Sequence, residues 1–107
     1  MSVVKMEKIK ELAKIIADNY MPYKIILFGS YARGTATEDS DIDILVVKDS
    51  DKTHNRRSAE VYKYFRRMLF DIDILVYTQK EIEEWKNVKQ AFITTIINEG
   101  KVLYEKI

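Results

Sequence analysis

The sequence predicts an α/β (α+β) fold in which a small mixed β-sheet of about four strands is flanked by helices. Short apolar runs typical of buried strands alternate with longer stretches whose apolar residues recur at three- and four-residue steps, the period of a helix. The phrase Asp-Ile-Asp-Ile-Leu-Val occurs at 41–46 and again at 71–76. Because roughly 30 residues that contain a helix make one strand–helix–strand unit, we expect the two copies to be neighbouring strands. A chain of 107 residues is near the commonest domain size, so residues 1–107 are expected to form one domain.

The first part of the chain is expected to hold a helix, two strands and the connection between them. Ile9, Leu12 and Ile16 recur at helical steps, and Pro22 marks the end of this helix. Gly29 follows a strand-like apolar run and begins a tight turn into a short helical segment. We expect a helix at 4–19, a strand at 24–28 and a glycine turn with a helical turn at 29–34. A polar loop at 35–40 and a second strand at 41–47 follow.

The second part is expected to hold three further helices and two further strands. Thr78 and Glu81 have the spacing of a capping box, which marks the start of a helix. We expect a charged turn at 48–53, a helix at 54–69 and a strand at 72–77. The capped helix from residue 78, a last helix at 89–98 and a short strand at 102–104 follow. The side chains expected to pack inward from the two middle helices are Tyr62, Phe65, Leu69, Ile82 and Trp85. The last helix is expected to end at Gly100.

Pairs of aspartates stand at the entrance of two predicted strands. Ionised carboxylates are rarely tolerated beside apolar strand segments unless a cation or hydrogen bonds compensate them. Successive side chains in a strand alternate, so Asp41 and Asp43 lie on one face and can reach one metal ion. Mg²⁺ is usually held by one or two carboxylates together with substrate phosphates. The second pair, Asp71 and Asp73, could supply a third carboxylate. A solvated strand entrance without a ligand is the alternative for any single pair.

The segment from Gly29 to Gly34 is suited to a phosphate group. Glycine lets the backbone approach an anion closely, and N–H groups at the start of a helical turn point toward it. The Ser30 hydroxyl can add a hydrogen bond, and the Arg33 guanidinium, one turn on, can make paired hydrogen bonds to phosphate. An ordinary surface role is the alternative for Arg33. The polar loop that ends at Ser40 is expected to lie across the mouth of the site, which makes Ser40 a further candidate nucleotide contact.

Composition excludes several classes of protein. Formal net charge is +1 with 33% charged residues of both signs, which argues against a dedicated nucleic-acid surface. There is no cysteine, so disulfides, thiolate metal sites and cysteine nucleophiles are excluded. The first residues lack the apolar core of a signal peptide, and no apolar run approaches the ~18 residues of a membrane span. We therefore expect a cytoplasmic protein without a membrane partner.

With these residues in view, the chain resembles the minimal nucleotidyltransferases of the DNA polymerase beta superfamily. The signature of that family is Gly-Ser, ten residues, Asp-x-Asp, and a third acidic residue on a later strand. Gly29, Ser30, Asp41 and Asp43 match it position by position. Asp73 fits the frame of the third acid, with the neighbouring Asp71 in reserve. The resemblance runs from about residue 23 to residue 105 and implies the nucleotidyltransferase fold.

The resemblance implies an activity and a set of roles. Asp41, Asp43 and Asp73 would be the catalytic, metal-binding residues for two Mg²⁺ ions, and Asp73 would also act as the general base. Gly29, Ser30, Arg33 and Ser40 would bind the nucleotide. Minimal members commonly pair with a HEPN-domain ribonuclease toxin, and the MntA-like antitoxins among them add AMP from ATP to a toxin tyrosine. The implied function is adenylylation of a HEPN partner in a hetero-oligomer.

Two other functions stay open at this point. One is a non-catalytic, nucleotide-binding module that neutralises its partner by surface contact, against which the complete set of acidic positions argues. The other is a transferase with a small-molecule acceptor such as an aminoglycoside. That reading is disfavoured because the chain has no additional acceptor-binding domain, although a homodimer could build the missing wall.

Overall fold

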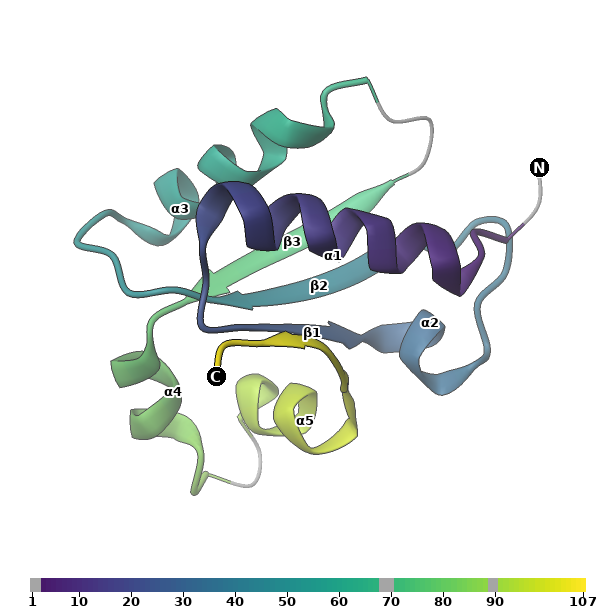
Figure 1. The fold of residues 1–107 in the computed structure, drawn as a ribbon. Helices are drawn as coiled ribbons and strands as arrows, with labels where there is room; N and C mark the ends of the chain where they lie inside the picture. The colour runs from purple at the N-terminus through teal and green to yellow at the C-terminus, as the bar shows by residue number, and fades with distance from the viewer. Residues whose placement is uncertain (1–2, 68–70, 89–90) are drawn as a thin grey trace.

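The computed structural model describes residues 3–67, 71–88 and 91–107 and shows a four-stranded sheet with helices on both faces (Figure 1). Strand order is β3-β2-β1-β4. The elements in chain order are α1 (Met6–Tyr20), β1 (Lys24–Phe28), α2 (Gly29–Arg33), β2 (Ile42–Val47), α3 (His54–Tyr62), a 3₁₀ turn (Lys63–Phe65), β3 (Ile72–Tyr77), α4 (Gln79–Trp85), α5 (Phe92–Glu99) and β4 (Lys101–Glu105). The expected α/β class and mixed four-stranded sheet are confirmed.

The sheet is mixed because one of its strand pairs is parallel. β1 pairs antiparallel with both β2 and β4, whereas β2 and β3 run parallel. α3 connects the parallel pair, so the repeated Asp-Ile-Asp-Ile-Leu-Val phrases are neighbouring strands of one strand–helix–strand unit, as expected. Their register aligns Ile42 with Ile72 and continues through Val47 and Tyr77. Residues 42–46 of the first phrase therefore lie beside residues 72–76 of the second.

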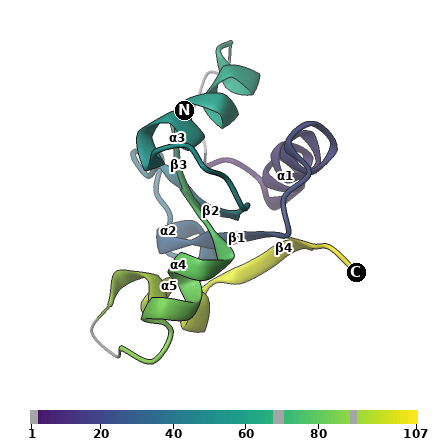
Figure 2. The same cartoon turned by 90° about the vertical axis from the view of Figure 1, so that its left-hand side faces the viewer.

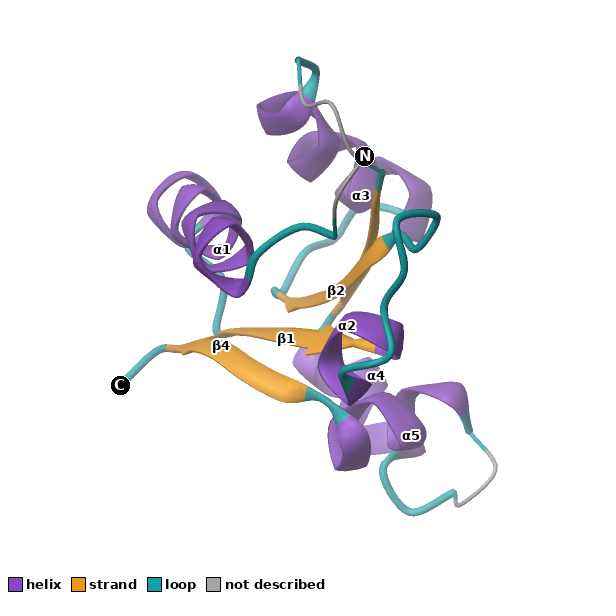
Figure 3. Cartoon of the chain, turned by 90° about the vertical axis from the view of Figure 1, so that its right-hand side faces the viewer, coloured by secondary structure: helices purple, strands orange, loops and turns teal. Residues whose placement is uncertain are grey.

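The two faces of the sheet carry separate apolar clusters. Helices α1 and α3 cover one face, and α4 and α5 cover the other (Figures 2 and 3). Alternation along β2 divides its side chains between them, since Ile44 and Val46 belong to the cluster under α1 and α3 while Leu45 and Val47 belong to the other. Every residue of β2 except Asp43 is buried. Asp43 is thus the polar exception in the most protected strand.

The expected α1 is confirmed, with its buried side formed by Ile9, Leu12, Ala13, Ile16 and Tyr20. The helix ends in a left-handed residue, Met21, at φ 51°, immediately before Pro22. The expected short helical turn after β1 is α2, and Gly34 ends it with φ 77°. Positive φ is accessible to glycine without steric cost, which explains why the turn stops there.

The helix expected at 54–69 differs from the observed one. Its α-helical part ends at Tyr62, and the chain continues as the 3₁₀ turn. Phe65 is buried as expected, but the prediction that Tyr62 packs inward is wrong, because its side chain is 38% exposed and reaches round the free edge of β3. The prediction for Leu69 lies outside the described residues.

The capped helix α4 is confirmed with its capping box. The Thr78 hydroxyl accepts the Glu81 N–H at 3.1 Å, and the Glu81 carboxylate accepts the Thr78 N–H at 2.8 Å. Ile82 packs against the second cluster, but the expectation for Trp85 is wrong, because it is 49% exposed. α4 is only seven residues long, and Trp85 is its last residue. The start expected for the last helix, 89–90, lies outside the described residues.

Arg57 ties α3 to the end of β3 and to α4. Its guanidinium is almost fully buried and donates to the Glu81 carboxylate at 2.7 Å and to the backbone carbonyls of Val76 at 3.3 Å and Lys52 at 2.8 Å. Burial alone would raise the pKa of Glu81, but the Thr78 N–H and the Arg57 guanidinium outweigh it and hold that pKa below its usual range. The pair therefore fixes α3 on the sheet.

We expect Arg57→Met to lower the free energy of unfolding by about 2 kcal/mol, because Glu81 and two carbonyls lose a charged donor. Urea denaturation followed by circular dichroism measures the change. Arg56→Met is the matched control, since the adjacent Arg56 is exposed, and its effect should stay within about 0.5 kcal/mol. Equal effects of the two variants would contradict the role given to Arg57.

Candidate functional site

The parallel pairing of β2 and β3 brings two carboxylates together. Asp43 and Asp73 are register partners, and neighbouring strands lie about 4.8 Å apart. Both side chains lie on the α4–α5 face, because Leu45 and Leu75, two residues further along each strand, pack in the cluster of that face. Asp43 is half-buried, whereas Asp73, on the edge strand, is exposed. The fold thus sets an adjacent pair of acids at one end of the sheet.

Gly29 closes the same end of the sheet from β1. Phe28, the last residue of β1, pairs with Asp43, and Gly29 follows with φ +74°. A Cβ atom placed on Gly29 would collide with an oxygen of the Asp43 carboxylate. Both the backbone angle and the lack of space therefore require glycine at this position. Gly29, the first residue of α2, therefore lies beside the acidic strand end. Ser30 follows it in α2 but does not line the cleft that opens there.

A cleft of about 260 Å³ opens over these residues. Its lining includes Gly29, Arg33, Asp43 and Asp73, so four of the residues predicted from the sequence meet in one place. The remaining lining residues are Phe28, Phe92, Thr95, Ile96 and Glu99. Most of these belong to α5, whose contribution sequence reasoning missed, because the apolar pattern of residues 92–99 indicates only a helix that packs on the sheet.

Negative charge outweighs positive charge around Asp43 in the cleft. Burial raises the pKa of Asp43 to about 6, and the charges of Asp73 and Asp41 add to the increase, while Arg33 opposes it. Carboxylate oxygens are the ligands that Mg²⁺ prefers, so the donor set fits a hard divalent cation. Within the described ranges, however, no three acidic, histidine or cysteine side chains converge into a complete metal site. Asp43 and Asp73 form a pair, and Asp41 is an exposed residue just before β2.

The other candidate residues occupy different places. The Ser40 hydroxyl accepts the Thr37 N–H at 2.9 Å and closes a turn within the polar loop, and Ser40 does not line the cleft. The backbone carbonyl of Asp71 accepts the Ile42 N–H at 2.9 Å, and Asp71 does not line the cleft either. Of the two acids in the second phrase, the geometry therefore favours Asp73.

Tyr62 makes a contact with the acidic pair that sequence reasoning missed. Its hydroxyl donates to Asp73 Oδ1 at 3.3 Å and accepts the Ile74 N–H at 2.8 Å. Burial raises the pKa of Tyr62, the Ile74 bond opposes that increase, and the Asp73 charge adds to it. No short sequence signal marks this contact, because it depends on where α3 ends relative to the edge of β3.

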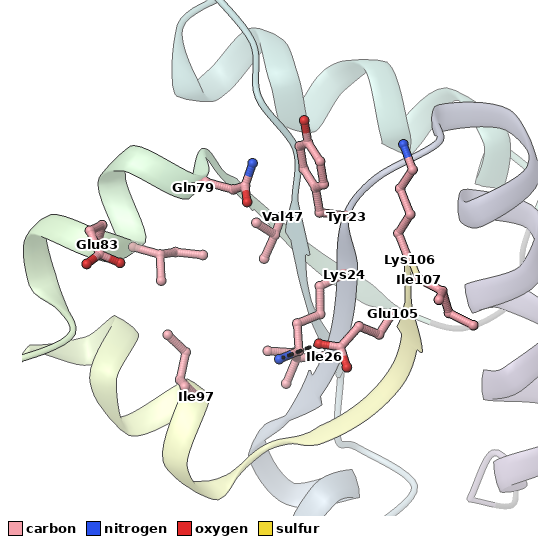
Figure 4. Close-up of a pocket in the computed structure, with 11 residues that line it drawn as sticks. Tyr23, Lys24, Ile26, Val47, Gln79, Glu83, Ile97, Glu105, Lys106 and Ile107 are labelled. Carbon is pink, nitrogen blue, oxygen red and sulfur yellow. Dashed lines mark ion pairs between the residues drawn. The ribbon is translucent and has the colours of Figure 1, made fainter.

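A larger cleft of about 570 Å³ lies on the same face at the opposite end of the sheet (Figure 4). Ile26, Val47 and Ile97 line it together with the ion pair between Lys24 and Glu105, whose charged atoms are 3.1 Å apart. It contains no pair of adjacent carboxylates among its described lining residues. Although this cleft is larger, the smaller cleft is the better candidate site because the adjacent carboxylates of Asp43 and Asp73 line it.

A β-sheet that carries paired acids beside a Gly-Ser turn defines a nucleotidyl-transfer site as a class. Residues 9–106 match the model of the nucleotidyltransferase domain, so the chain belongs to this family. A relative from Methanocaldococcus jannaschii, named as a proposed protein adenylyltransferase, is 38% identical over 100 residues, which cover 90% of this chain and 94% of the relative.

Solved structures with the same fold include members of toxin–antitoxin pairs. One, crystallised as a toxin–antitoxin with AMP-PNP, is 27% identical with a TM-score of 0.60 and covers 91% of this chain and 73% of that one. Another, from a mutant of the toxin–antitoxin pair MntA–HpeT, is 25% identical with a TM-score of 0.61 and covers 96% and 75%. These likenesses support an MntA-like member of the family.

Across the described ranges, every helix is too short or too polar to cross a lipid bilayer.

We expect Gly29→Ala to destabilise the fold by about 3 kcal/mol and to abolish nucleotidyl transfer, because the new methyl group must displace the Asp43 carboxylate and the backbone must hold a positive φ. Thermal denaturation and a transfer assay measure the two effects. Gly34→Ala is the matched control. Gly34 has a similar φ of +77° but open space at its Cβ, so only about 1 kcal/mol of backbone strain is expected. Equal losses for both variants would show that the Asp43 contact is unimportant.

The raised pKa of Asp43 predicts a pH-dependent stability. An unfolded aspartate loses its proton near pH 4, whereas folded Asp43 keeps its proton to about pH 6. Folded protein is therefore penalised as pH rises through this window, and the penalty is complete above it. Without added metal, Asp43→Asn should be more stable than the parent by about 1–2 kcal/mol at pH 8, after allowance for solvent screening.

This advantage of Asp43→Asn should vanish as pH falls to about 4, where the parent carboxyl is protonated in both states. Urea denaturation from pH 4 to 8 measures it. Asp39→Asn makes the same charge change in the exposed loop and should show no comparable trend. A constant difference between Asp43→Asn and the parent across this range would contradict the prediction.

Proposed function

We propose that this nucleotidyltransferase transfers AMP from ATP to a hydroxyl group of a protein, and that the acceptor is a tyrosine of a cognate HEPN-domain toxin, which the transfer neutralises. The observation that carries the proposal is the in-register pair Asp43 and Asp73, set against Gly29 in one cleft. We also propose that residues 1–107 form one domain and that the protein is cytoplasmic.

The comparisons support the acceptor class. The Methanocaldococcus jannaschii relative is named for protein adenylylation, and this chain covers 94% of its length, so the likeness extends over almost the whole relative. The likeness to a toxin–antitoxin crystallised with AMP-PNP supports both an adenine nucleotide and a toxin partner. We infer a hetero-oligomer of the chain with that toxin.

The chemistry of the site supports a requirement for Mg²⁺, and family resemblance implies two ions. Asp41, Asp43 and Asp73 would hold them, since burial together with the charges of Asp73 and Asp41 raises the pKa of Asp43, and a bound cation would offset both effects. When bound, the metal compensates negative charge on the phosphates and on the leaving pyrophosphate.

The protein residues then divide between binding and proton transfer. Gly29 would let the backbone approach the phosphates, and Arg33 would offer a guanidinium at the cleft. Ser30, the residue after Gly29, would offer a hydroxyl group, whereas Ser40 lies outside the cleft and receives no role here. Asp73 takes the proton of the attacking hydroxyl. The hydroxyl oxygen bonds to the α-phosphorus, the bond to the bridging oxygen breaks, and pyrophosphate leaves. Positioning and charge compensation supply most of the rate enhancement.

The test is incubation with α-labelled ATP, Mg²⁺ and the product of the neighbouring gene, followed by intact mass of both chains. We expect one or more AMP masses on the partner. Asp43→Asn and Asp73→Asn should lower the rate of labelling by at least about 100-fold. Asp71→Asn is the matched control, because Asp71 has the same local sequence but does not line the cleft, and it should retain most of the activity.

A stable complex without any AMP adduct would refute the transferase and indicate a binding module instead. Labelling of a small molecule such as an aminoglycoside, with an unlabelled partner, would refute only the acceptor. Equal losses in Asp71→Asn and Asp73→Asn would refute the role given to Asp73.

A further inference from the structure

The Tyr62 hydroxyl lies beside Asp73, the residue that the proposed function makes the general base. Tyr62 is the last residue of α3, and its ring extends to the open edge of β3, the outermost strand of the sheet. There its hydroxyl lies 3.3 Å from Asp73 Oδ1 and 2.8 Å from the Ile74 nitrogen. A general base must lie within hydrogen-bond reach of the proton that it removes, and such bonds are often long before substrate binds.

The other tyrosines of the described ranges lack this arrangement. The Tyr64 hydroxyl, two residues away, donates to the backbone carbonyl of Asn19 in α1 at 3.5 Å. The Tyr31 hydroxyl accepts the Val4 N–H at 3.1 Å. Tyr20 is 8% exposed and packs in the core. Tyr62 is distinguished by both its acidic partner and its 38% exposure.

We propose that Tyr62 is itself an acceptor, so that the chain adenylylates its own Tyr62 in cis. This inference rests on the proposed function, because it requires ATP in the cleft and AMP transfer to a phenolic hydroxyl. It goes beyond that function in assigning a modification site to this chain.

The bonding at the Tyr62 oxygen leaves it able to attack. A phenolic oxygen has one proton and two lone pairs. The proton points to Asp73, and one lone pair accepts the Ile74 N–H, so the second lone pair remains for the phosphorus. That lone pair forms the bond to the α-phosphorus of ATP, the phenolic proton passes to Asp73, and the α–β bridging bond breaks to release pyrophosphate. The products are Tyr62-O-AMP and pyrophosphate.

Self-adenylylation would also remove a tie at the edge of the sheet. The modified oxygen has no proton to donate, so the bond to Asp73 is lost, and the bulky nucleotide must extend into solvent from a side chain that is already partly exposed. Asp73 would then be released from this contact and available to a second acceptor. Modified and unmodified chains are therefore expected to differ in their rate of transfer to a partner.

The experiment incubates the purified chain alone with ATP and Mg²⁺ and measures its intact mass and the modified peptide. A parallel reaction contains the neighbouring-gene product. We expect one AMP on the peptide that contains Tyr62, formed at a first-order rate that does not depend on protein concentration. Tyr62→Phe should lose the adduct and Tyr64→Phe should keep it. Thermal denaturation verifies that both variants fold.

The outcomes separate the inference from the proposed function. If the partner is labelled and the chain is not, self-transfer is refuted while the proposed function stands. If Tyr62→Phe then also slows labelling of the partner, Tyr62 positions Asp73 and is no acceptor. An adduct that persists in Tyr62→Phe, or a rate that rises with protein concentration, refutes the assignment to Tyr62 in cis. No adduct on either chain refutes both.

Discussion

The structure depends on the parallel, in-register pairing of β2 with β3. This pairing places Asp43 directly beside Asp73, an arrangement that like charges oppose. The sheet can hold it because β2 is an inner strand whose other residues are all buried, so its register cannot slip without moving apolar side chains out of both clusters. The packing of apolar side chains along β2 therefore holds the Asp43 carboxylate beside that of Asp73 at the end of the strand.

Each neighbouring element supplies one requirement of the site. β1 is followed by Gly29 because a Cβ atom at this position would collide with the Asp43 carboxylate, and α5 forms the opposite wall of the cleft. α3 returns the chain from β2 to β3, and the buried Arg57 fixes that helix to the strand. The acidic residues, the turn proposed to bind phosphate and the helix that lines the cleft thus come from segments far apart in the sequence. The sheet brings these segments together.

Local patterns were enough to predict the elements themselves. β1 and β3 have the predicted bounds because short apolar runs with clear borders leave little freedom, and the Thr78–Glu81 capping box gives the start of α4. Contacts between elements were not predictable in this way. Tyr62 and Trp85 have helical spacing typical of buried residues, yet each lies where its helix ends. Asp71 and Asp73 are each followed by isoleucine, so the local sequence does not distinguish them. The register between β2 and β3, which pairs Asp73 with Asp43, does.

The repulsion at the strand ends has a thermodynamic consequence. Repulsion between the two carboxylates lowers the free energy of unfolding, and a cation bound between them would relieve that repulsion. The repulsion that destabilises the empty site would therefore favour binding of the proposed cation. The folded state would then gain stability as the concentration of that cation rises.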